Sequence, residues 1–112
     1  MSDVPSILIV DDEPVARSRL RELLADLAPE FPHRIVGEAP NAPEALSQIE
    51  VAQPQIVLLD IQMPGMTGIE LASHFQVLER PPSVIFATAH NQYAVEAFEV
   101  NAVDYLLKPV RA

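Results

Sequence analysis

Short apolar runs alternate along the chain with longer segments in which apolar residues recur at helical spacing. Five of these runs predict β-strands, at residues 7–10, 34–37, 56–59, 84–87 and 103–107. Most of them are apolar at consecutive positions, which is typical of strands buried on both faces of a sheet. The pattern therefore predicts a sheet with helices on each side.

The segments between the runs predict four helices. Pro14 suits the first turn of the first helix, and leucines recur after it along one helix face. Asn41 can cap the second helix together with an acid three residues later, as in a capping box. Thr67 can cap the third helix, which we expect to present Leu78 on its inner face and to end at a pair of prolines. A short fourth helix is expected near residues 93–98.

The alternation of strands and helices predicts an α/β fold with a parallel sheet. Right-handed crossovers between parallel strands place helices on both faces of that sheet. The chain has 112 residues, and no linker or internal repeat interrupts the alternation. One domain over residues 1–112 is therefore expected.

Composition and charge narrow the classes of function. The formal net charge is −9, from 16 acids and 7 bases, which argues against this domain binding DNA through its phosphates. The chain has no cysteine, so neither disulfides nor thiolate zinc sites are available to it. No apolar stretch approaches the ~20 residues that span a membrane, and the first residues lack the basic region of a signal peptide. These features predict a cytoplasmic protein.

Polar residues follow the apolar runs where each predicted strand ends. Asp11 and Asp12 come after the first run, and Asp60 comes after the third. Thr88 ends the fourth strand and Lys108 ends the fifth. In open α/β sheets, ligands bind beyond the carboxyl ends of the strands, so these five residues are expected to share one site.

The residue types in this set indicate phosphoryl transfer. Three carboxylates in one cleft repel each other unless a hard cation such as Mg²⁺, which prefers oxygen ligands, lies among them. A carboxylate can also act as a nucleophile and accept a phosphoryl group. A lysine and a threonine hydroxyl supply donors to phosphoryl oxygens.

The sequence resembles the receiver domains of two-component response regulators. Four motifs in register support the resemblance, at residues 7–14, 58–65, 87–89 and 104–109. The stretch at 88–98 is further similar to regulators that have a LytTR-type DNA-binding domain downstream. The resemblance implies a flavodoxin-like, doubly wound sheet of five parallel strands in the order 2-1-3-4-5.

The resemblance also implies a metal site. Asp60 would be the phosphoacceptor. Asp12 and Asp60 would bind Mg²⁺ directly, together with the backbone carbonyl of Gln62. Asp11 would bind the ion through water.

The same resemblance implies how phosphorylation is sensed. Thr88 and Lys108 would bind the phosphoryl group, and Tyr105 matches the aromatic residue that switches rotamer in the family. Gln62 and His90 lie two residues after Asp60 and Thr88, and we hypothesise that they tune the rate at which water attacks the acyl phosphate.

The expected function is a signalling switch that receives a phosphoryl group from a sensor histidine kinase. Its output would be transcription, controlled through a DNA-binding domain that is absent here. Receivers usually carry a fifth helix after the lysine–proline pair, and this chain has three residues after Lys108-Pro109. We therefore expect an N-terminal fragment of a longer regulator, and self-association, such as a homodimer, through the apolar face left uncovered.

Two other classes remain open from the residues. An Mg²⁺-dependent phosphohydrolase could use Asp60 as nucleophile, although Gln62 stands where such enzymes are expected to have a second aspartate. A flavin-binding module of the same fold is the third class, but the acids at 11 and 12 would repel a phosphate in the absence of a metal.

Overall fold

The computed structural model describes residues 4–88 and 104–107, with the side chains of Thr88 and of residues 104–107 left out. Strands and helices alternate along most of this chain. The strands are β1 (Ser6–Val10), β2 (Arg34–Ala39), β3 (Ile56–Leu59), β4 (Ser83–Thr88) and β5 (Asp104–Leu107). The helices are α1 (Pro14–Leu27), α2 (Ala42–Ala52) and α3 (Gly68–Phe75).

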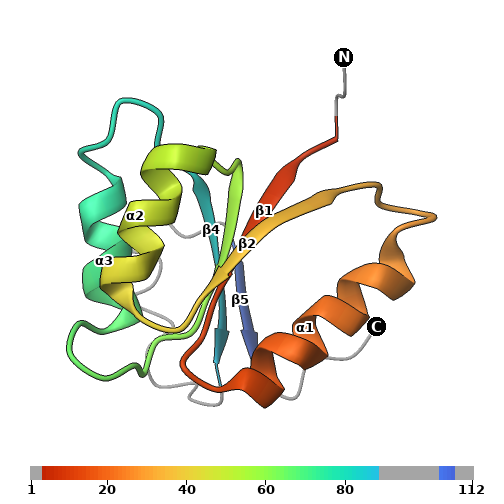
Figure 1. Cartoon of the computed structure of the whole chain (residues 1–112), viewed down its shortest axis with the longest axis horizontal. Helices are drawn as coiled ribbons and strands as arrows, with labels where there is room; N and C mark the ends of the chain where they lie inside the picture. The colour runs from red at the N-terminus through yellow and green to blue at the C-terminus, as the bar shows by residue number, and fades with distance from the viewer. Residues whose placement is uncertain (1–3, 89–103, 108–112) are drawn as a thin grey trace.

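The strands form one parallel sheet in the order β2-β1-β3-β4-β5 (Figure 1). The predicted α/β fold with a parallel sheet is confirmed. β1 lies between β2 and β3, so its carboxyl end is close to the carboxyl ends of both. The expected fourth helix at 93–98 lies outside the described residues.

Side chains at alternate positions of the strands belong to two apolar clusters, one on each face of the sheet. Leu8 and Val10 of β1 belong to the cluster that also holds buried residues of α2 and α3. Ile7 and Ile9 belong to the second cluster, with Leu20 and Leu24 of α1. Figure 1 shows the same division, with α1 on one side of the sheet and α2 and α3 on the other. Burial on both faces explains why β1 is apolar at nearly every position.

The helix starts follow the predicted caps, with one difference. Thr67 and Glu70 form a full capping box at the start of α3, in which each side chain accepts a backbone N–H of the other residue. At α2, Asn41 accepts the backbone N–H of Glu44 at 2.9 Å. The contact in the other direction joins Asn41 Nδ2 to a carboxylate oxygen of Glu44 at 3.3 Å, so the reciprocal box expected there is replaced by a side-chain pair.

The third helix is shorter than expected. It ends at Phe75, and the N–H of Leu78 donates to the carbonyl of Phe75 at 3.1 Å in a turn. Leu78 nevertheless packs against the core, as its apolar character requires. Within residues 4–88 and 104–107, no helix combines the length and apolar character needed to cross a membrane.

Candidate functional site

Three carboxylates meet at the carboxyl edge of the sheet. Asp11 directly follows β1 and Asp60 directly follows β3, the strand beside it. Asp11 is fully buried and Asp60 is 6% exposed, while Asp12 is half-buried. One carboxylate oxygen of each residue lies within 4.8 Å of the other two. The predicted convergence of these three side chains is therefore observed.

Backbone hydrogen bonds hold two of these acids in place. The N–H of Asp60 donates to the carbonyl of Val10 at 3.0 Å, and the N–H of Asp11 donates to the carbonyl of Ala39 at 3.0 Å. The ladders of the sheet thus continue past the ends of β1 and β3 to the acids themselves. Because main-chain groups make these bonds, the sheet places the acids independently of their side chains.

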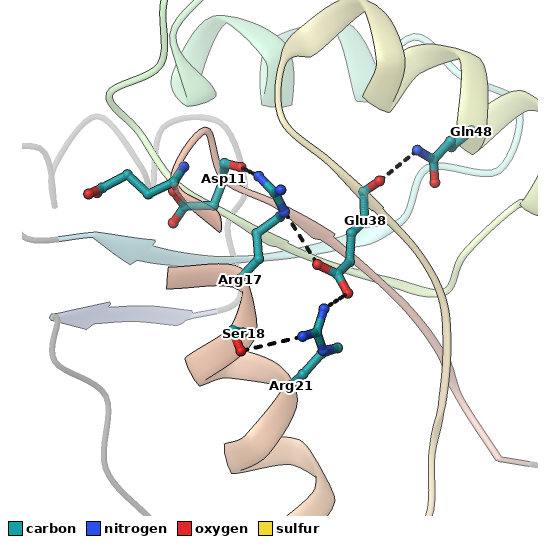
Figure 2. Close-up of polar contacts among 7 residues, drawn as sticks. Asp11, Arg17, Ser18, Arg21, Glu38 and Gln48 are labelled. Carbon is teal, nitrogen blue, oxygen red and sulfur yellow. Dashed lines mark hydrogen bonds and ion pairs between the residues drawn. The ribbon is translucent and has the colours of Figure 1, made fainter. Parts of the chain in front are cut away.

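The turn between β1 and α1 gives Asp11 a fixed orientation. Its Oδ1 accepts the backbone N–H of Glu13 at 3.0 Å, a local turn that aspartate forms readily. Its backbone carbonyl accepts a hydrogen bond of 2.6 Å from Nη1 of Arg17 (Figure 2). The residue is therefore held at its N–H, its carbonyl and its carboxylate.

The segment after β3 is anchored at alternate residues. Ile61 and Met63 are buried, whereas the side chain of Gln62 is exposed. The N–H of Gly68, the first residue of α3, donates to the carbonyl of Ile61 at 2.6 Å. A Cβ atom on Gly68 would lie 2.1 Å from the carbonyl oxygen of Asp60, so α3 begins directly against the backbone of the central acid.

The acids fit a magnesium ion by their chemistry and their spacing. Mg²⁺ binds oxygen ligands at about 2.0–2.1 Å in an octahedron, so neighbouring ligands lie about 3 Å apart and opposite ligands about 4.2 Å apart. The three carboxylate oxygens lie within 4.8 Å of each other, so those that bind the ion directly would have to approach by at most about 2 Å to become neighbouring ligands. Two buried carboxylates at this distance also repel each other strongly, which makes the site favourable for a cation.

Of the other residues predicted to belong to the site, the structure describes the backbone positions of two. Thr88 is the last residue of β4 and pairs with Leu107 of β5, so the ends of β4 and β5 lie next to each other in the sheet. Tyr105 lies within β5, opposite Phe86. Lys108 and His90 lie outside the described residues.

The roles of two residues at the site, Arg17 and Gly68, were not predicted from the sequence. Arg17 reads only as a polar position on the first helix, because its acceptor is a backbone carbonyl that the sequence does not display. In the sequence, Gly68 is recognisable only as the first residue after the capping Thr67. The lack of a side chain at that position was the one feature that could have predicted a close approach of two backbones.

Comparisons with known proteins agree on one family. The sequence model of one protein family, the response regulator receiver domain, matches residues 7–112. A positive alginate biosynthesis regulatory protein of Pseudomonas aeruginosa is 50% identical over 108 residues, which are 96% of this chain and 42% of that protein. The transcriptional regulatory protein LytR of Staphylococcus aureus is 46% identical over 102 residues, 91% of this chain and 40% of that protein. The expected likeness to LytTR-type regulators is confirmed.

Solved structures show the same fold. The crystal structure of the response regulatory domain of mrkE from Klebsiella pneumoniae has a TM-score of 0.85 and 32% identity, and the match covers 95% of this chain and 84% of that one. The chain spans about two fifths of the length of the curated relatives described above, at 42% and 40%.

Proposed function

Because the chain belongs to the family of response regulator receiver domains, which are phosphoacceptor signalling modules, we propose that Asp60 is its phosphoacceptor. The observation that supports this assignment is the position of Asp60 between two strand ends, with its carboxylate within 4.8 Å of those of Asp11 and Asp12. Asp60 is also the acid that follows the central strand β3, which β1 and β4 flank.

The proposed reaction is a transfer from a phosphohistidine of a sensor kinase. A carboxylate oxygen of Asp60 attacks phosphorus, the new O–P bond forms, and the N–P bond breaks with its electron pair returning to the imidazole. The product is an acyl phosphate whose phosphoryl group carries about −1.5 to −2 charges, in place of the single charge of the Asp60 carboxylate and beside two other carboxylates. Such a product requires neutralisation by cations.

In this proposal the chain binds one neutralising cation, Mg²⁺, and supplies a second positive charge from a side chain. Asp12, Asp60 and the backbone carbonyl of Gln62 would hold Mg²⁺ directly, and Asp11 would hold it through water. When bound, the ion offsets the charge of the carboxylates and of the phosphoryl oxygens. Lys108 adds a second positive charge to the phosphoryl group.

The proposed switch follows the phosphoryl group outward from the site. Thr88 donates its hydroxyl to a phosphoryl oxygen, and Tyr105 changes rotamer as the region around Thr88 moves. Gln62 and His90 set the rate of hydrolysis from the rim of the site. Exchanging these two residues should change the rate of dephosphorylation, and an unchanged rate would reject their role.

The proposed output is transcription. The relatives are longer proteins, and two of them are named as a biosynthesis regulatory protein and a transcriptional regulatory protein. We propose that this domain is cytoplasmic and belongs to a regulator that binds DNA through a separate LytTR-type domain and self-associates, as a homodimer or otherwise. The sensor histidine kinase is its proposed partner upstream.

Intact mass after treatment with acetyl phosphate and Mg²⁺ tests the phosphoacceptor. The native chain should gain the mass of one phosphoryl group, and Asp60→Asn should gain none. Asp26→Asn, which removes an exposed acid from α1, is the matched control and should gain the same mass as the native chain. Phosphorylation of Asp60→Asn to the native extent would reject the assignment, and steady turnover of a small phosphoester would favour a phosphohydrolase instead.

A further inference from the structure

Arg17 and Glu38 connect the acidic site to the edge strand β2. Nη1 of Arg17 donates to the carbonyl of Asp11 at 2.6 Å, and Nε of Arg17 donates to a carboxylate oxygen of Glu38 at 3.3 Å (Figure 2). Glu38 is followed by Ala39, whose carbonyl accepts the N–H of Asp11. These bonds close a ring that runs from Asp11 through Arg17 and Glu38 back to Asp11.

The ring is partly withdrawn from solvent and is fixed from a second side. The side chains of Arg17 and Glu38 are 18% and 23% exposed. The carbonyl of Glu38 accepts Nε2 of Gln48, on α2, at 2.8 Å. The other carboxylate oxygen of Glu38 pairs with Arg21, which does not contact Asp11 among the described interactions. Hydrogen bonds between charged groups are stronger than neutral ones, so the ring resists displacement of Asp11.

The ring matters because the three carboxylates repel each other before a cation binds. The N–H of Asp11 is anchored to β2, but without support at its carbonyl the repulsion would favour conformations of the turn in which the carboxylates lie farther apart. A site that relaxes must be reassembled when the ion binds, and that cost appears as weaker binding. Mutation of a residue that orients a metal ligand commonly lowers metal affinity by about 10–100-fold.

We propose that Arg17, oriented by Glu38, is a positioning residue that holds the Asp11–Asp12 turn in its metal-binding geometry before the cation arrives. This inference rests on the proposed magnesium site. Arg17 acts through the backbone carbonyl of Asp11 and touches neither the ion nor the phosphoryl group.

The sign of the charge effect separates positioning from simple electrostatics. Arg17→Met removes a positive charge near the site, and charge alone would then make Mg²⁺ bind more tightly. Loss of positioning predicts the opposite, a dissociation constant raised about tenfold. Arg19→Met removes the same charge from an exposed position on the same helix, and should leave the constant unchanged or slightly lower.

The experiment measures the Mg²⁺ dissociation constant by titration calorimetry, and metal-free stability by urea denaturation, for the native chain and for Arg17→Met, Arg19→Met, Glu38→Gln and the double variant Arg17→Met/Glu38→Gln. Glu38→Gln should weaken binding several-fold in the native background and have almost no further effect in the Arg17→Met background, because it acts through Arg17. Additive effects of the two substitutions would overturn the proposal.

Two further outcomes are informative. Arg17→Met binding Mg²⁺ as tightly as Arg19→Met, with lowered stability, would make the ring a structural contact only and would also overturn the proposal. If the native chain failed to bind Mg²⁺, the proposed magnesium site would be rejected. The positioning role of Arg17, which rests on that site, would be rejected with it.

Discussion

Gly37 and Gly68 offer a direct test of what keeps the start of α3 against the site. A Cβ atom added at either position would meet another atom at the same distance, 2.1 Å. At Gly68 that atom is the backbone carbonyl oxygen of Asp60, with two further backbone atoms at 2.9 Å. At Gly37 it is the amide oxygen at the end of the flexible side chain of Gln48. We predict that alanine is costly at Gly68 and cheap at Gly37.

The cost at Gly68 comes from the backbone. An ordinary contact begins near 3.4 Å, so the helix or the backbone of Asp60 has to move by more than 1 Å. Overpacking of this kind costs about 1–3 kcal/mol, and the upper part of that range applies because no side chain can rotate away. The better helix propensity of alanine returns at most about 1 kcal/mol. The expected net loss of unfolding free energy is about 2 kcal/mol.

The cost at Gly37 is limited to one hydrogen bond. The amide of Gln48 has to leave the carbonyl of Glu38, which costs about 1 kcal/mol. Replacing a glycine within a strand returns about 0.5–1 kcal/mol. The two terms nearly cancel, so Gly37→Ala should remain within about 0.5 kcal/mol of the native chain.

Thermal and urea denaturation of the two variants measure the difference. Unfolding entropy near 60 °C is about 2.1 cal/mol/K per residue, which for 112 residues converts a loss of 2 kcal/mol into a fall in Tm of about 8 °C. Gly37→Ala should melt within about 2 °C of the native chain. A Gly68→Ala variant that melts as high as Gly37→Ala would refute the claim that α3 is seated directly on the backbone of Asp60.

Three further predictions concern acids and assembly. Hydrogen bonds from Thr67, first from its backbone N–H and then from its side chain, hold the pKa of Glu70 below its ordinary value of 4.5. Glu70 therefore contributes stability above pH 4.5 that is lost as the pH falls through the lower folded pKa, and the stability difference between the native chain and Glu70→Gln in urea should shrink over that acid range. Asp12→Asn should raise stability in metal-free buffer by relieving repulsion from Asp11 and Asp60, and should lower the stabilisation that Mg²⁺ gives the native chain; equal stabilisation of both proteins by Mg²⁺ would contradict this. Self-association through the uncovered apolar face should appear in sedimentation at high concentration, and a clean monomer mass in that experiment would count against it.

The central strands could be predicted closely because burial on both faces leaves them few polar positions, which lie at the strand ends. The run at 56–59 coincides with β3, and the runs at 7–10 and 84–87 differ from β1 and β4 by one residue at their ends. The second strand was predicted at 34–37 but extends to Ala39. Gly37 and Glu38 are weak strand formers, and what keeps them in the sheet is pairing with β1 together with contacts to Gln48 and Arg17, none of which is local in sequence.

The acids of the site could be predicted for a topological reason. Parallel strands present their carboxyl ends at one edge, so residues that follow β1 and β3 must meet whatever the intervening loops do. The supports behind those acids follow no such rule. The contact of Arg17 with the carbonyl of Asp11 depends on the angle at which α1 leaves the turn, and the seating of Gly68 on Asp60 depends on the path of the loop after β3.

The main-chain bonds that place Asp11 and Asp60 have a use for protein engineering. They join N–H and carbonyl groups of Asp11 with Ala39 and of Asp60 with Val10, so they survive any exchange of the acidic side chains that leaves the backbone unchanged. Asparagine has nearly the volume of aspartate and would project from the same two anchored points, whereas glutamate or histidine would also need room beside the buried side chains there. The edge of this sheet could therefore be refitted to prefer ions of other size or softness while the scaffold beneath it stays as it is.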